Sequence, residues 1–113
     1  MLEITPIQTK EEQKDICGLC GVEFNFDYLA YSAKENGKLL GISQFRIFGD
    51  CGVIYDLANA GGVDDFDALV IMGKAALDFM LRCGVKNTRI KINNAELIKA
   101  IIDQPCKKTN ADY

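Results

Sequence analysis

The sequence predicts a mixed α/β domain in which a mostly antiparallel sheet is flanked by helices. Two observations lead to this prediction. The pair Asn36-Gly37 separates two apolar runs and signals a β-hairpin, because both residues tolerate the positive φ of a type I′ turn. Apolar residues then recur at helical spacing over residues 65–82, which indicates a helix with one buried face.

The first elements are a short strand and a helix. The strand is expected over residues 2–8 and ends near Pro6. Thr9 precedes two glutamates and is therefore a candidate N-cap, with acidic side chains in the first turn where they favour the helix dipole. The helix is expected to run to about Cys20 and to end at Gly21, a favourable residue after a helix C-terminus.

Three strands in an antiparallel meander follow this helix. They are expected at residues 28–33, 39–48 and 53–58. The first two are joined by the Asn-Gly turn and the last two by a turn over residues 49–52. Alternation along the third strand puts Tyr55 on the face opposite Asp56, where it is expected to serve in packing.

The second half of the chain contains the clearest helix, a strand and a short helix. Asp64 or Asp65 is expected to cap the helix over 65–82. Its predicted buried residues are Phe66, Leu69, Val70, Gly73, Ala76, Leu77, Met80 and Leu81. Residues 88–93 alternate apolar and polar side chains as a strand does, and 95–103 form the final helix. We expect one domain over 1–113, with 104–113 as a flexible tail.

Composition excludes several classes of protein. The net charge is -3 and basic residues are scattered, which argues against a nucleic-acid binder. The chain shows no signal peptide and no apolar run long enough to span a membrane, so we expect a cytoplasmic protein with no membrane partner. Histidine is absent, which removes Ser-His and Cys-His pairs and the commonest zinc ligand, so no metal site is expected.

Cys17 and Cys20 form a C-x-x-C pair near the end of the first predicted helix. A redox motif of this kind opens a helix, where the dipole lowers the thiol pKa, whereas this pair closes one. No second pair completes a zinc site. Both thiols are therefore expected to serve as apolar packing groups.

The order of elements resembles the core of the GNAT N-acetyltransferase family. Residues 36–43 resemble that family's hairpin, residues 54–58 its fourth strand and residues 73–80 its central helix. The resemblance extends over roughly residues 2–103. It implies that the chain transfers an acetyl group from acetyl-CoA to an amine, either a small molecule or a peptide.

The resemblance also implies a site. The pantetheine arm pairs with the fourth-strand backbone, and the diphosphate sits at the start of the central helix through a Q/R-x-x-G-x-G/A motif. With the final motif glycine placed on Gly73, the implied cofactor-binding residues are Leu57, Ala58, Asn59, Gly61, Gly62, Ala68, Gly73, Lys74 and Asn94. Asp56 is the implied general base, since side chains at its place in the strand face the amine. On residue grounds alone, the position of Asn94 is fully explained by an N-cap, which is the preferred interpretation. Lys74 is alternatively part of a solvated helix face and Asp56 an edge-facing or ion-paired aspartate.

Three features depart from the family pattern. Ala68 and Ile71 replace the Gln/Arg and the middle glycine of the motif, and the loop before the helix is acidic, with carboxylates at Asp64, Asp65 and Asp67. The family's general-acid tyrosine falls near Ile101, which donates no proton. The chain also lacks the family's final strand pair, which predicts an exposed fifth strand and a homodimer across it. These departures leave an alternative function: a degenerate, non-catalytic binding, regulatory or structural protein whose CoA site is closed.

Overall fold

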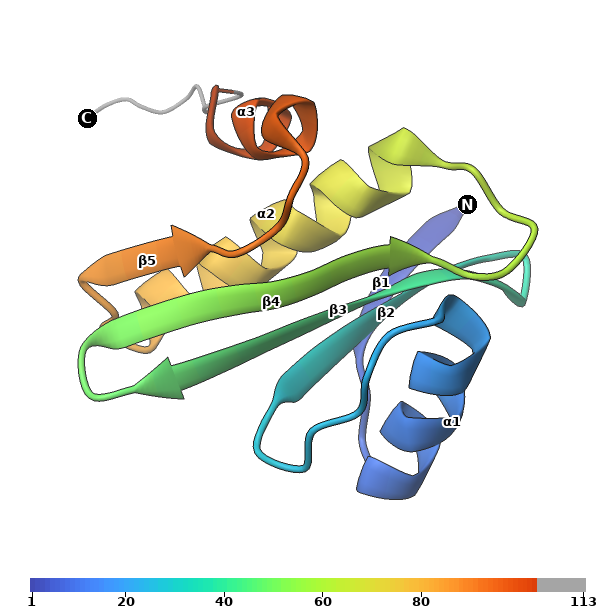
Figure 1. Cartoon of the computed structure of the whole chain (residues 1–113), viewed down its shortest axis with the longest axis horizontal. Helices are drawn as coiled ribbons and strands as arrows, with labels where there is room; N and C mark the ends of the chain where they lie inside the picture. The colour runs from blue at the N-terminus through green and yellow to red at the C-terminus, as the bar shows by residue number, and fades with distance from the viewer. Residues whose placement is uncertain (104–113) are drawn as a thin grey trace.

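A five-stranded sheet in the order β1-β2-β3-β4-β5 forms the centre of the molecule (Figure 1). This computed structural model describes residues 1–103, so the tail predicted at 104–113 lies outside the described residues. The strands are β1 (Leu2–Pro6), β2 (Leu29–Glu35), β3 (Lys38–Phe48), β4 (Cys51–Asn59) and β5 (Asn87–Ile90). The first four strands pair antiparallel, and β5 pairs parallel with β4. The predicted mixed and mostly antiparallel sheet is confirmed.

Three helices flank the sheet: α1 (Lys10–Cys20), α2 (Phe66–Arg82) and α3 (Ala95–Asp103). Figure 1 shows α1 and α2 on opposite faces of the sheet, with α3 beside α2. β4 and β5 are adjacent and parallel in the sheet, although α2 lies between them in the sequence. Parallel neighbours need a crossover connection, and α2 provides it by returning the chain to the end of the sheet where β4 begins. All eight predicted elements are present.

Local sequence signals account for the ends of these elements. Thr9 Oγ1 accepts a hydrogen bond from the Glu12 N–H at 3.1 Å, and Asp65 Oδ1 accepts one from the Ala68 N–H at 3.0 Å, so both act as N-caps. The hairpin turn has φ values of 53° at Asn36 and 81° at Gly37, as a type I′ turn requires. Of the two predicted caps for α2, the structure therefore selects Asp65.

The buried face of α2 differs in part from the predicted one. Ala68 and Met72 are fully buried, whereas Phe66 is 37% exposed and Leu81 is 64% exposed. The buried face of α2 therefore includes other residues than predicted, because one side of the helix packs on the sheet and an adjacent side packs on α3. Apolar periodicity marks a broad stripe, and tertiary packing decides which part of it is covered.

None of the helices among residues 1–103 is long and apolar enough to cross a membrane. β5 has no strand partner on its outer side within the same residues, so the sheet ends there in an open edge. A homodimer across this edge stays a prediction.

Candidate functional site

The two halves of β4 have different partners. From Cys51 to Ile54 the strand pairs with both β3 and β5, and the Lys91 N–H closes this ladder on the Ile54 carbonyl at 2.8 Å. From Asp56 to Asn59 it pairs only with β3 among the described residues. Figure 1 shows the chain after β5 turning away from β4 toward α3. The backbone groups of residues 55–59 that point away from β3 are thus available to an extended ligand, as at any open strand edge.

A β-bulge lies at the point where the strands part. Gln44 pairs with Asp56 and Phe45 with Ile54, so Tyr55 is an extra residue without a partner on β3. The bulge breaks the alternation of side chains. The Tyr55 ring stacks on Tyr28, with centroids 4.4 Å apart and an interplanar angle of 5°, on the side of the sheet that α1 covers. The prediction that Tyr55 lies on the face away from Asp56 is therefore wrong.

Asp56 lies at the end of a buried chain of amide side chains. Gln44 is fully buried on β3, and its Nε2 donates to Asp56 Oδ2 at 2.8 Å and to the Glu23 carbonyl at 2.9 Å. Its Oε1 accepts from Gln13 Nε2 at 2.9 Å and from Cys17 Sγ at 3.3 Å. With both ends of this amide occupied by two bonds each, Gln44 has a fixed orientation and holds the Asp56 carboxyl in place.

The surroundings of Asp56 change its acidity. Burial raises the pKa of this half-buried carboxyl above its ordinary value, the hydrogen bond from Gln44 partly offsets that increase, and the nearby Glu23 charge adds to it. A carboxylate with a raised pKa binds a proton more strongly than an exposed one, which suits it to act as a base. The structure thus places the residue predicted as general base in a partly buried position with a hydrogen bond from Gln44.

Tyr28 is a candidate proton donor that the sequence did not reveal. Burial raises its pKa, followed by the influence of Tyr55 and of Asp56, so its hydroxyl keeps the proton at neutral pH. It comes from the segment after α1, and only the fold brings it beside Tyr55 and Asp56. Nothing in the local sequence around Tyr28 distinguishes it from a packing residue.

Backbone N–H groups of the loop between β4 and α2 donate hydrogen bonds to other groups of the protein. The Asn59 side chain accepts from the Asp65 N–H at 3.2 Å and donates to the carbonyls of Leu40 and Asp65, both at 3.2 Å. The Gly61 N–H donates to the Leu19 carbonyl at 2.9 Å. Together with the Asp65 cap, these bonds occupy part of the anion-binding capacity of the helix start. The acidic side chains add a charge of the wrong sign for a diphosphate.

Three of the predicted cofactor residues lie away from this loop. Gly73 is in the middle of α2, where a Cβ atom would come within 2.5 Å of Ile101 Cδ1, so it serves the close contact with α3. Ala68 is completely buried in the first turn. The Lys74 amino group donates to the Ile101 carbonyl at 3.4 Å and faces α3. The motif placement on Gly73 therefore puts the final motif glycine inside α2, about two turns after the helix begins at Phe66.

The remaining predicted cofactor residues lie on the open half of β4, in the turn after it and at the start of α3. Leu57, Ala58 and Asn59 lie in the unpaired half of β4, as the resemblance implied. Gly61 and Gly62 lie in the exposed turn that follows, with a φ of 80° at Gly62. Asn94 Oδ1 accepts from the Leu97 N–H at 3.0 Å, so its side chain is the N-cap of α3.

Cys17 and Cys20 are buried free thiols of α1, as expected. Burial raises the pKa of Cys20 to about 11, which keeps it protonated and unreactive. Among residues 1–103, no group of three or more His, Cys, Asp or Glu side chains is placed to hold a metal ion.

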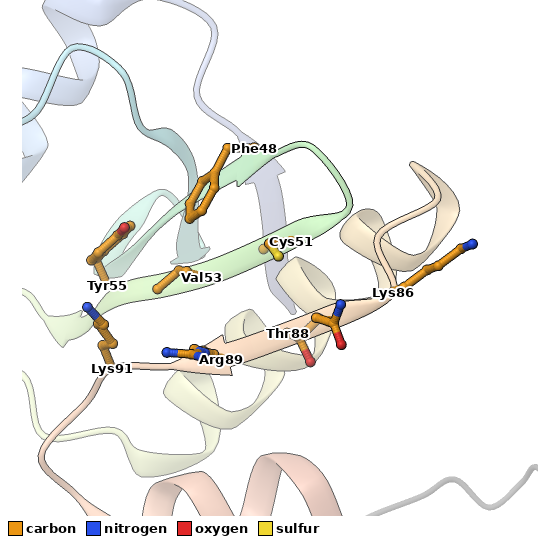
Figure 2. A pocket seen from close by; sticks show the side chains of 10 residues that line it. Phe48, Cys51, Val53, Tyr55, Lys86, Thr88, Arg89 and Lys91 are labelled. Atoms are coloured by element: carbon orange, nitrogen blue, oxygen red, sulfur yellow. The ribbon is translucent and has the colours of Figure 1, made fainter.

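An open groove runs along β4 and β5 on the sheet face that carries Tyr55, with a volume of about 750 Å³ (Figure 2). We call it the β4–β5 groove. It is lined by Phe48, Cys51, Gly52, Val53, Tyr55, Lys86, Asn87, Thr88, Arg89 and Lys91. The groove reaches Tyr55, the residue that directly precedes the candidate base in the chain.

Similar arrangements occur in solved acetyltransferase structures. An aminoglycoside acetyltransferase, meta-AAC0020 from an uncultured soil metagenomic sample, matches with a TM-score of 0.71 at 10% identity over 99% of this chain and 94% of its own. Protein SA2161 of methicillin-resistant Staphylococcus aureus, described as a probable acetyltransferase, matches with a TM-score of 0.63 at 13% identity over 100% of this chain and 98% of its own. The GNAT-family acetyltransferase SP0256 of Streptococcus pneumoniae TIGR4 matches with a TM-score of 0.60 at 13% identity over 85% and 80% of the two chains.

The chain has the GNAT fold. No protein-family model and no curated protein matches the sequence. The likeness to GNAT structures is thus one of architecture, and in this chain the fourth and fifth strands separate at the open half of β4. What this GNAT domain does depends on the residues that surround that opening.

Proposed function

We propose that this GNAT-fold chain transfers an acetyl group from acetyl-CoA to an amine at the open half of β4. The observation that supports it is the position of Asp56, a half-buried carboxyl with a raised pKa on the strand segment that β5 leaves unpaired. An open backbone edge beside a fixed base is the arrangement that this chemistry needs.

In the proposed reaction the amine nitrogen attacks the acetyl carbonyl carbon, the bond from that carbon to sulfur breaks, and the nitrogen loses a proton. Asp56, oriented by Gln44, accepts that proton. Tyr28 keeps its own hydroxyl proton at neutral pH and is the proposed donor to the departing sulfur. Backbone N–H groups of residues 55–59 that face the opening bind the donor's extended arm.

The residues of the site fit acetyl-CoA unequally. The unpaired backbone of Leu57, Ala58 and Asn59 fits the amide-bearing pantetheine arm. The start of α2 does not fit a diphosphate in the usual way, because Asp64 and Asp67 add negative charge and Asp65 caps the helix itself. We therefore propose that the diphosphate stays outside the first turn of α2 and that Gly61 and Gly62 only allow close passage of the arm.

The acceptor is proposed to be a small amine. One neighbour in architecture is an aminoglycoside acetyltransferase in complex with sisomicin. The β4–β5 groove has a volume typical of small-molecule sites, which agrees with an acceptor of that size. A small amine that enters this groove reaches Tyr55 and the adjacent Asp56.

The acidic loop supports a second candidate function, that of a non-catalytic GNAT-fold binding protein. Calorimetric titration with acetyl-CoA separates the two. We would compare the wild type with the double variant Asp64→Asn and Asp67→Asn, which removes two charges and leaves the Asp65 cap intact. The matched control is Glu11→Gln with Glu12→Gln, an equal charge change in the first turn of α1.

Acetyltransferase function predicts micromolar binding to the wild type, tighter binding to the loop variant and unchanged binding to the control. Binding by the loop variant alone would show a closed site and support the second candidate. Absence of binding by all three proteins would exclude acetyl transfer by this domain. In a transfer assay with any accepted amine, Asp56→Asn should lower the rate by roughly 100-fold or more while acetyl-CoA still binds.

A further inference from the structure

The β4–β5 groove has aromatic side chains along one side and basic side chains along the other. Figure 2 shows Phe48 and Tyr55 on the β3–β4 side, Arg89 and Lys91 on the β5 side, and Val53 between them. Apolar groups thus form the floor and one wall, and charged groups form the opposite rim. Small-molecule sites combine these two features, with a few charges that fix the orientation of the ligand.

Three cations line the groove, Lys86, Arg89 and Lys91, and a fourth, Arg46, contacts the lining residue Phe48. The Arg46 guanidinium lies over the Phe48 ring at 5.5 Å from its centroid, and the Lys91 amino group lies over the Tyr55 ring at 5.9 Å. None of the four is ion-paired with another residue among 1–103. Contacts with ring faces hold two of these cations in place without neutralising them.

This concentration of positive charge contrasts with the chain as a whole. The full sequence has 13 basic and 16 acidic residues, a net charge of -3. Two carboxylates adjoin lining residues in the sequence: Asp50, which accepts from Cys51 Sγ at 3.6 Å, and Asp56, which follows Tyr55. No acidic side chain of residues 1–103 lines the groove itself. Such a cleft attracts anions and repels polycations.

We propose that the β4–β5 groove selects amine acceptors that carry an anionic group, a carboxylate or a phosphate, at the end away from the amine. The anion lies between Arg89 and Lys91, and the amine points toward Asp56. This inference rests on the proposed acetyl transfer for the role of the bound molecule, but its binding is independent of transfer. A polycationic amine is excluded by the same charges, so the similarity to an aminoglycoside acetyltransferase would extend to the size of the acceptor and not to its charge.

The test is titration followed by amide NMR shifts, with three amine probes: L-glutamate, phosphoethanolamine and spermidine. The first carries carboxylates, the second a phosphate and the third only positive charge. The groove variant is Arg89→Gln with Lys91→Gln. The control is Lys14→Gln with Lys38→Gln, an equal charge change at exposed positions on α1 and at the start of β3. Folding of each variant is checked by its dispersed spectrum.

We expect glutamate or phosphoethanolamine to shift amides over residues 51–55 and 86–91, and the better one identifies the anion as carboxylate or phosphate. The groove variant should lose at least tenfold in affinity and the control should keep it. Three results would overturn the proposal: no shift with either anionic amine, equal affinity of spermidine, or unchanged affinity of the groove variant. A single-stranded oligothymidylate that binds the groove more tightly than both amines would also overturn it, since exposed cations and aromatic rings suit such strands.

The same samples separate this inference from the proposed function. If an anionic amine binds the groove and is not acetylated when acetyl-CoA is added, the anion site stands and acetyl transfer fails. If acetyl-CoA supports acetylation of spermidine and neither anionic amine binds, acetyl transfer stands and the anion site fails.

Discussion

The two faces of the sheet differ in what they bury. On the α2 face, the largest fully buried side chains are apolar, among them Phe45, Ile54, Met72 and Met80. On the α1 face, a second apolar cluster that includes Ile42 is joined by the buried amides Gln13 and Gln44, and the Asp56 carboxyl ends their chain of hydrogen bonds. Apolar burial needs no partners, whereas buried amides must satisfy every donor and acceptor. Both faces therefore stabilise the fold, and the α1 face also carries the groups that we propose for catalysis.

The difference between the faces continues along β4. Its first half lies between two strands and contributes Ile54 to the α2 face. Its second half begins with the bulge at Tyr55 and has β3 as its only strand partner among residues 1–103. The fully paired half of β4 and its open half thus meet at Tyr55. The unpaired backbone of the second half is therefore held by a rigid part of the sheet.

The largest expected effect is on the α2 face. Ile54→Ala removes a completely buried side chain and should lower the free energy of unfolding by about 2–5 kcal/mol, measured by urea denaturation. Ile54→Val should cost only about 0.5–1.5 kcal/mol. If the alanine variant loses no more than the valine variant, the α2 face is not the closed core described above.

The next effect is on the α1 face. Gln44→Leu deprives Asp56 and the Glu23 carbonyl of their donor and should cost about 1–3 kcal/mol. It should also raise the pKa of Asp56 further, because the bond from Gln44 is the contact that lowers it. Gln8→Leu, the same change at an exposed position, is the control and should stay within about 0.5 kcal/mol. A neutral result for Gln44→Leu would mean that the amide chain has no structural role.

A smaller effect of opposite sign is expected at Asp56. Its folded-state pKa is raised, so the folded protein binds the proton more readily than the unfolded chain, and wild-type stability falls as pH rises through this window. Asp56→Asn removes that penalty, so this variant should be more stable than the wild type at pH 7. The difference should vanish below about pH 4, the ordinary range of an aspartate. Asp15→Asn, the same substitution on the exposed surface of α1, is the control.

The smallest effect is expected at Ser43, a polar exception on the α2 face. Its hydroxyl is fully buried and has no hydrogen-bond partner among residues 1–103. Ser43→Ala should therefore be neutral or stabilising by up to about 1 kcal/mol in urea denaturation. A loss above 1 kcal/mol would show that the hydroxyl has a partner in solution and that this face is more polar than described.

The sequence predicted the elements better than their contacts. Caps and turns are local, so Thr9, Gly37 and Asp65 could be recognised without the fold. The face of Tyr55 could not, because a bulge depends on the partner strand. The contact of Gly73 with α3 was not predicted either, because it depends on how the two helices pack against each other.

The site was predicted only in part for the same reason. Asp56 and the open backbone from Leu57 followed from the family resemblance. Gln13, Gln44 and Tyr28 lie on three different segments and meet only through long-range pairing, so no local pattern marked them. The cations of the β4–β5 groove were scattered in the sequence and gather because β5 lies beside β4.

The most direct test of acetyl-CoA binding at the open half of β4 is amide hydrogen exchange with and without that ligand. Binding there should slow the exchange of amides over residues 55–59 and leave unchanged β2, which is already paired on both sides. Acetyl-CoA that binds without slowing exchange over residues 55–59, or that does not bind at all, would contradict the account.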